Sequence, residues 1–197
     1  MKSIKSLMAT AMLSISVLGF SLSAAASEYI IDTNGAHAFI NFKISHLGFS
    51  WVHGNFKNFK GTFSFDAVDP TKSKVNVEID TGSIDSGHAE RDKHIRGDKY
   101  LNSSEFPKAY FVSKRIENKG KNNVLIYGDL TIKGIKKPIV IDAVKIGEGK
   151  DPWGGYRAGF SGTTSINLAD FNIASLGPTA TKVYLTLDVE GIRKEEK

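Results

Sequence analysis

The five histidines are the residues whose type and spacing first suggest chemistry, because all of them fall between His37 and His94. Imidazole is a common metal ligand, so a metal site is the first hypothesis to weigh. His88 and Asp92 are four residues apart and can share one face of a helix, whereas His94 leaves that face. The sequence has no HExxH pattern and no cysteine. We therefore expect no metal site and no cofactor, and interpret the histidines as surface or hydrogen-bonded side chains.

Hydrolytic chemistry has equally little support. Ser161 lies in Gly-Phe-Ser-Gly, which is not the GxSxG pattern, and it falls in a predicted strand rather than at a strand-to-helix turn. The acidic residues between positions 66 and 80 fall in turns or on the outward side of strands, which gives no glycosidase-like carboxylate pair. No glycine-rich phosphate loop is present. We expect a protein without catalytic residues.

Most of the chain alternates apolar and polar residues, which is typical of half-buried β-strands. Such runs predict strands near residues 29–31, 36–46, 59–66, 75–80, 110–116, 124–132, 137–146, 156–168 and 183–189. Closing these sequential strands into an eight-stranded antiparallel barrel removes exposed sheet edges. A two-sheet sandwich is the alternative. The long run 156–168, which can bend at Gly159 and Gly162, favours the barrel and an all-β fold.

The stretch from Ser83 to Pro107 breaks the alternation and predicts one short helical insertion around residues 87–96. Ser86 is placed to cap its start, and Gly97 to end it in a left-handed conformation. The helix is polar on nearly all sides, so it must lie against the sheet or beside an opening.

At an opening, Arg91, His94 and Arg96 would contact a polar or anionic head group. A surface crossover whose charges are merely solvated is an equally good interpretation.

Residues 1–26 resemble a cleavable secretory signal, because Lys2 and Lys5 precede an apolar run that ends in small residues. We predict cleavage between Ala26 and Ser27, a single domain over residues 27–197, and a periplasmic location. No later apolar run is long enough to span a membrane.

The charge balance excludes some partners. The net charge is +5, or +3 without the two signal lysines, and the basic residues are dispersed along strands, so we expect no nucleic-acid partner. Without cysteine the chain forms no disulfide, and its stability must come from its core.

Strand parity predicts an apolar interior rich in aromatic residues. A closed barrel with such an interior either packs solid or leaves a tube for a long apolar ligand. The expected lining residues are Ile40, Phe42, Ile44, Phe63, Phe65, Tyr110, Ile126, Leu130, Phe160 and Leu185.

Several ordered motifs resemble those of the YceI family over the whole of residues 27–197, including its periplasmic enterobacterial-type members. They are Gly35–Phe39, His46–Trp51, Gly61–Asp66, Arg91–Arg96, Gly128–Gly134, Asp151–Gly155 and Arg157–Phe160. The sequence departs from the usual family pattern at Ile135–Lys137 and at Gly97. The resemblance implies a lipocalin-like barrel that carries a helix, a cavity for a polyisoprenoid chain, and no catalytic activity.

Three functional hypotheses follow. The first is a periplasmic protein that binds, transports or stores an isoprenoid lipid, either polyprenyl or quinone-like. The second is an enzyme that modifies such a lipid, with His94 or His46 as acid or base. The third is a ligand-free interaction module related to stress. The sequence leaves a homodimer open.

Overall fold

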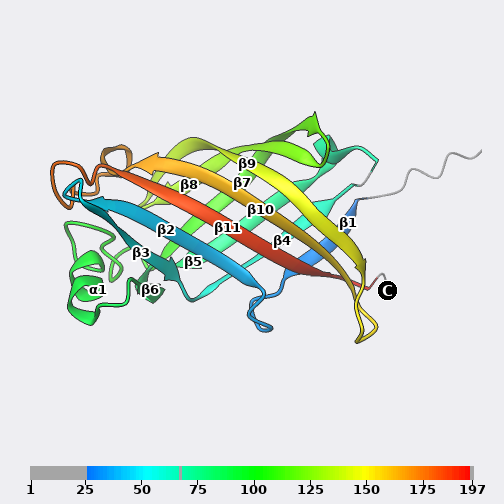
Figure 1. Cartoon of the computed structure of the whole chain (residues 1–197), viewed down its shortest axis with the longest axis horizontal. Coiled ribbons are helices and arrows are strands. Elements are labelled where there is room, and N and C mark those ends of the chain that lie inside the picture. Colours follow the sequence, from blue (N-terminus) through cyan, green and yellow to red (C-terminus); the bar gives the residue numbers. More distant parts are fainter. Residues whose placement is uncertain (1–25, 67, 196–197) are drawn as a thin grey trace, which may run out of the picture.

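The computed structural model describes residues 26–66 and 68–195, so all but the last residue of the predicted signal peptide lies outside the described residues. Within these ranges the chain forms one α-helix, three short 3₁₀ helices and a single sheet (Figure 1). The helices are α1 (Ala89–Ile95), η1 (Pro70–Lys72), η2 (Thr81–Ser83) and η3 (Leu168–Phe171). The strands are β1 (Ser27–Ile31), β2 (Ala38–His46), β3 (Ser50–Phe56), β4 (Phe59–Phe65), β5 (Lys74–Asp80), β6 (Ile84–Asp85), β7 (Lys108–Gly120), β8 (Asn123–Ile132), β9 (Ile135–Lys150), β10 (Tyr156–Asn167) and β11 (Lys182–Arg193).

The sheet closes on itself. Strands β1, β4, β5, β7, β8, β9, β10 and β11 pair antiparallel in that order, and β1 also pairs with β11 to complete a ring of eight. Closure satisfies backbone N–H and C=O groups that an open sheet would leave at its edges. The predicted eight-stranded barrel with one short helix is confirmed, and the two-sheet sandwich is wrong.

Strand β11 is long enough to pair with two strands along the same edge. Its end pairs with β1, from Gly191 to Arg193, and its first part pairs with β2, from Val183 to Val189. Strand β2 continues the sheet into β3 and the two-residue β6. This extension lies beside α1 at one end of the barrel (Figure 1).

An irregularity in the pairing of β10 occurs at Gly159, the first of the two glycines where a bend was expected. The pairing register between β9 and β10 shifts between Gly159 and Phe160, because Gly159 pairs with Gly147 and Phe160 pairs with Lys145. Ile146 therefore has no opposite residue in β10. Such a bulge bends the strand and increases its twist, which a closed barrel requires.

Side chains fill the barrel interior at the end where α1 lies. Ile95 from α1, Leu101 from the following loop and Phe171 from η3 pack with strand residues such as Ile132 and Ile166. Phe171 is only 1% exposed. Connecting segments, and not only strands, thus complete this part of the core.

The helix α1 begins differently from the sequence prediction. His88 provides the N-cap, since its Nδ1 accepts a hydrogen bond from the N–H of Arg91 at 3.2 Å. Ser86 instead donates its hydroxyl hydrogen to the buried carboxylate of Asp92 at 2.5 Å. The predicted left-handed stop at Gly97 is also wrong, because the positive φ angles of the described glycines do not include it.

An ion-pair network closes part of the opposite end of the barrel. Arg157 Nη1 lies 2.6 Å from Asp32 Oδ2 and 2.5 Å from Glu190 Oε1, and its Nε lies 2.7 Å from Asp151 Oδ2. Hydrogen bonding to Arg157 lowers the pKa of Asp32 to about 2. One guanidinium thus joins the ends of β1, β10, β11 and the β9–β10 loop.

Candidate binding cavity

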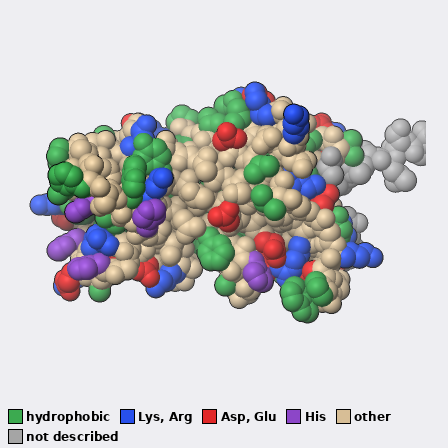
Figure 2. All heavy atoms as spheres, viewed as in Figure 1, with side chains coloured by type: hydrophobic (Ala, Val, Ile, Leu, Met, Phe, Trp, Pro, Cys, Tyr) green, Lys and Arg blue, Asp and Glu red, His purple; other side chains and the backbone are tan. Residues whose placement is uncertain are grey.

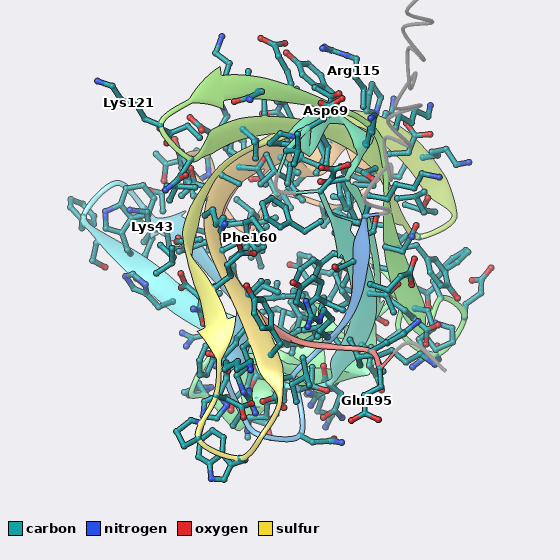
Figure 3. All side chains as sticks on the ribbon, turned by 90° about the vertical axis from the view of Figure 1, so that its right-hand side faces the viewer. Lys43, Asp69, Arg115, Lys121, Phe160 and Glu195 are labelled. Carbon is teal, nitrogen blue, oxygen red and sulfur yellow. The ribbon has the colours of Figure 1, made fainter. Side chains whose placement is uncertain are left out.

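The barrel contains an apolar cavity. Residues of β4, β5, β7, β8, β9, β10 and β11 line it, and Ile31 of β1 and Ile40 of β2 contribute one side chain each. Its empty volume is about 1130 Å³, counting the part that is open to solvent. The part of this space that the centre of a water-sized sphere can occupy is about 150 Å³. Figure 3 views the barrel from the end opposite α1 and shows Phe160 inside the ring of strands.

Four lining residues carry hydroxyl groups, and the protein itself engages each of them. The bonds are Lys74 N–H to Ser64 Oγ (3.1 Å), Asp66 N–H to Ser73 Oγ (3.1 Å), Ser161 Oγ to Asp188 Oδ1 (2.7 Å) and Thr164 Oγ1 to the Val140 carbonyl (2.7 Å). The surface that faces the cavity is apolar. A ligand inside would therefore be held by burial of hydrocarbon and not by polar anchors.

Three aromatic rings belong to the lining, and one ion pair lies beside them. The Phe160 ring stands nearly edge-on to Phe63 and Phe65, with centroids 5.4 Å apart in both pairs. Lys145 Nζ lies 4.6 Å above the Phe65 ring and 3.0 Å from Glu148 Oε1. Because the lysine is paired with a carboxylate, this part of the lining carries little net charge.

Strand parity placed most of the expected lining residues at the cavity. The structure puts seven of the ten in the lining: Ile40, Phe63, Phe65, Ile126, Leu130, Phe160 and Leu185. Phe42 and Ile44 are also buried, in the core cluster that includes Ile95 of α1 and Phe171, but they are not part of the lining. Parity identifies the side of a strand that faces inward, and it does not tell how far along the barrel a residue lies.

The expected inward position of Tyr110 is wrong. Tyr110 is 43% exposed, while its neighbours Ala109 and Phe111 are buried. Both faces of β7 carry apolar residues here, so alternation alone does not show which face points inward. A register shift between Ser113 and Arg115 changes the parity along the strand, so Phe111 and Ile116 both line the cavity.

Sequence reasoning missed the contribution of β5. Val75, Val77 and Ile79 all line the cavity. Their regular alternation with Asn76, Glu78 and Asp80 was the signal that could have placed them there.

The three residues expected to meet a head group do not line the cavity. Arg91 donates hydrogen bonds from Nε to the Ser86 hydroxyl and from Nη2 to the Ser86 carbonyl, both at 2.7 Å. Arg96 Nη1 lies 3.4 Å from the Ile84 carbonyl, and His94 is exposed on α1. The structure thus favours the interpretation of this helix as a surface crossover.

One cluster of potential metal ligands occurs among the described residues. Asp32, His37 and Glu190 offer atoms within 4.8 Å of one another. The Arg157 guanidinium already bonds both carboxylates, and a metal ion beside it would be repelled. The cluster therefore fits the ion-pair network and not a metal. The other four histidines are exposed and lie outside it.

A closed antiparallel barrel with an apolar cavity and one crossover helix defines a lipocalin-like barrel. No helix in the described part of the chain is long and apolar enough to cross a membrane.

Comparison with known proteins gives the family. The model of the YceI-like domain matches residues 29–191, and the chain belongs to this family. A UPF0312 protein of Shewanella oneidensis is 55% identical over 174 residues, which cover 88% of this chain and 91% of the relative.

Solved structures share the fold. The crystal structure of the Campylobacter jejuni YCEI protein is 31% identical, with a TM-score of 0.70 over 78% of this chain and 91% of that one. A polyisoprenoid binding domain from Saccharophagus degradans has a TM-score of 0.62 at 14% identity, over 86% of this chain and all of that one.

Proposed function

We propose that this protein binds an isoprenoid lipid, polyprenyl or quinone-like, by enclosing its tail in the barrel cavity for transport or storage. The observation that carries the proposal is a cavity lining inside the barrel that presents hydrocarbon, with its hydroxyl groups already bonded to the protein. The polyisoprenoid binding domain that shares this fold supports the choice of ligand. The protein acts in this proposal as a carrier and not as an enzyme.

The physical basis is burial of the tail. Each CH₂ group moved from water into such a cavity gains about 0.8 kcal/mol. Methyl-branched isoprenoid units suit a lining of phenylalanine, isoleucine and valine side chains, because both are irregular apolar surfaces that pack by shape. The paired charges of Lys145 and Glu148 beside the lining are compatible with a weakly charged head group.

Export belongs to the same proposal. Residues 1–26 have the composition of a signal peptide, and cleavage between Ala26 and Ser27 would release the barrel into the periplasm. Mass spectrometry of protein recovered from the periplasm of a producing bacterium should show Ser27 as its first residue. Recovery of the uncleaved chain from the cytoplasm would contradict this part of the proposal.

Two adjacent residues of β9 provide a matched test of the binding site. Ile141 lines the cavity and is 8% exposed, whereas Val140 is 42% exposed and lies on the outer face. Native mass spectrometry after gentle extraction, followed by titration with a polyprenol, should show lipid bound to the unaltered protein and to Val140→Phe. Ile141→Phe fills part of the cavity and should weaken binding about tenfold or more.

Circular dichroism and thermal unfolding check that both variants retain the fold. Equal binding by the two variants, or no uptake of polyprenol by the unaltered protein, would contradict the proposal. An enzymatic role has less support, because His46 and His94 are exposed and neither lines the cavity.

A further inference from the structure

Exposed apolar side chains gather around the β2–β3 turn, outside the cavity. Leu47 is 51% exposed, Phe49 is 89% exposed and Trp51 is 47% exposed. Leu176 and Tyr184, which are 40% and 41% exposed, come from the segment that leads into β11 and from β11 itself. We call these five residues the turn patch. Aromatic residues exposed at such levels suggest an interaction surface.

The patch is continuous across two segments that are distant in sequence. The Ser45 hydroxyl donates a hydrogen bond to Thr179 Oγ1 at 3.2 Å, which joins the β2–β3 turn to the segment before β11. The Trp51 and Tyr184 rings meet edge to face, with centroids 5.6 Å apart. Phe49 is the last residue of the turn and lies two residues before Trp51 in the sequence.

The turn is held in a defined conformation. Leu47 and Gly48 both have positive φ angles, of 54° and 83°. The Gly48 N–H donates to Ser45 Oγ at 3.2 Å, and the Phe49 N–H donates to the His46 carbonyl at 2.9 Å. The turn thus presents its apolar side chains from a hydrogen-bonded backbone, so their exposure is part of the fold.

The two stretches that build the patch carry only basic charges. The sequence contains no acidic residue from position 33 to 65 or from 171 to 187, the two stretches that build the patch. Lys43 Nζ lies 4.9 Å over the Trp51 ring, and the exposed Lys182 begins β11. Figure 2 shows hydrophobic, basic, acidic and histidine side chains close together at the end of the molecule where α1 lies.

We propose that the turn patch docks on the surface of an anionic lipid bilayer. Tryptophan and tyrosine favour the membrane–water interface, and leucine and phenylalanine insert below the head groups. Lysines next to them gain from anionic lipids, while acidic residues, which would oppose docking, are missing from both stretches. The inference is independent of the ligand in the cavity, because the patch residues are not part of the lining.

The two tryptophans of the chain allow a direct test. Trp153 is 76% exposed in the β9–β10 loop, at the other end of the barrel (Figure 1). Trp153→Phe leaves Trp51 as the only reporter, and Trp51→Phe leaves Trp153. With vesicles of phosphatidylcholine and phosphatidylglycerol in equal parts, the fluorescence of Trp51 should shift to the blue and that of Trp153 should stay unchanged.

Vesicle co-sedimentation gives the size of the effect. The double variant Leu47→Ser, Phe49→Ser should lose about tenfold or more in partitioning. Lys43→Gln and Lys182→Gln should each lose about fivefold on the mixed vesicles and little on pure phosphatidylcholine. Trp153→Ser, an exposed aromatic outside the patch, is the control and should partition normally.

An unchanged Trp51 spectrum, or partitioning that the patch variants leave intact, would overturn the proposal. Sedimentation velocity adds one more outcome. A homodimer that Leu47→Ser, Phe49→Ser dissociates, without vesicle binding by the unaltered protein, would assign the patch to a second copy of the chain and would also overturn it.

Discussion

The two halves of the barrel interior are built from the same kinds of residue and differ in how they are filled. At the α1 end, side chains from α1, η3 and loops pack with strand residues, and Phe171 is 1% exposed. Further from α1, similar side chains such as Phe160 and Ile126 border the cavity, part of which is open to solvent.

The difference comes from the connecting segments. At the α1 end, Ile95, Leu101, Phe171 and Ile173 enter the interior from a helix and from loops, in addition to the strand residues. In the cavity half, Pro70 and Ser73 of the β4–β5 connection reach the lining, which otherwise comes from strands. Eight strands enclose an interior that is wide enough to need extra side chains or a ligand. The cavity lies where the connections do not fill it.

The largest expected effect separates two phenylalanines, one from each half. Phe171→Ala should destabilise the protein by about 3–5 kcal/mol, because it opens a void in a closely packed cluster. Phe160→Ala should cost only about 1–2 kcal/mol, because Phe160 already borders empty space. Urea unfolding of both variants measures the difference. Equal losses would show that the two halves are packed alike.

A second change tests the role of the connecting segments. Ile95→Ala should cost about 2–3 kcal/mol and should extend the free interior towards α1. We expect the variant to accept a longer polyprenol than the unaltered protein, as measured by native mass spectrometry over a series of chain lengths. An unchanged length preference would mean that Ile95 does not limit the cavity.

The ion-pair network gives the cavity half a pH dependence. Asp32 has its pKa lowered to about 2 by Arg157, so its carboxylate stabilises the fold above about pH 4, and this contribution is lost as the pH falls towards 2. The loss should be about 2 kcal/mol in urea unfolding experiments between these two pH values. Arg157→Gln should remove most of that slope. If the unfolding free energy of this variant still falls between pH 4 and pH 2, other carboxylates cause the pH dependence.

The smallest effect concerns the start of α1. His88→Ala removes the N-cap and should cost about 0.5–1 kcal/mol, with no effect on binding of lipid. Thermal unfolding and the polyprenol titration measure the two quantities. A loss of binding would show that α1 takes part in the site after all.

Much of the fold follows from the sequence, because alternation marks strands and sequential strands close to satisfy their edges. The seven expected residues that line the cavity come from the same signal. The position of Phe42 and Ile44 could not be predicted, since depth along the barrel depends on which connections enter it. The prediction for Tyr110 is wrong because a bulge in β7 changes which alternate residues face inward. Bulges depend on pairing between distant segments. Ser86 was the predicted N-cap of α1, but its hydroxyl group donates a hydrogen bond to the buried Asp92. His88 is the N-cap instead.

The central claim is that the cavity half of the barrel holds an isoprenoid tail. A crystal structure of the protein with a bound polyprenol tests it most directly. We expect the chain to run along Phe63, Phe160 and Leu130 and to end before the packed cluster around Phe171. An empty cavity in crystals of a complex that mass spectrometry shows to be loaded, with the lipid bound elsewhere, would contradict the account.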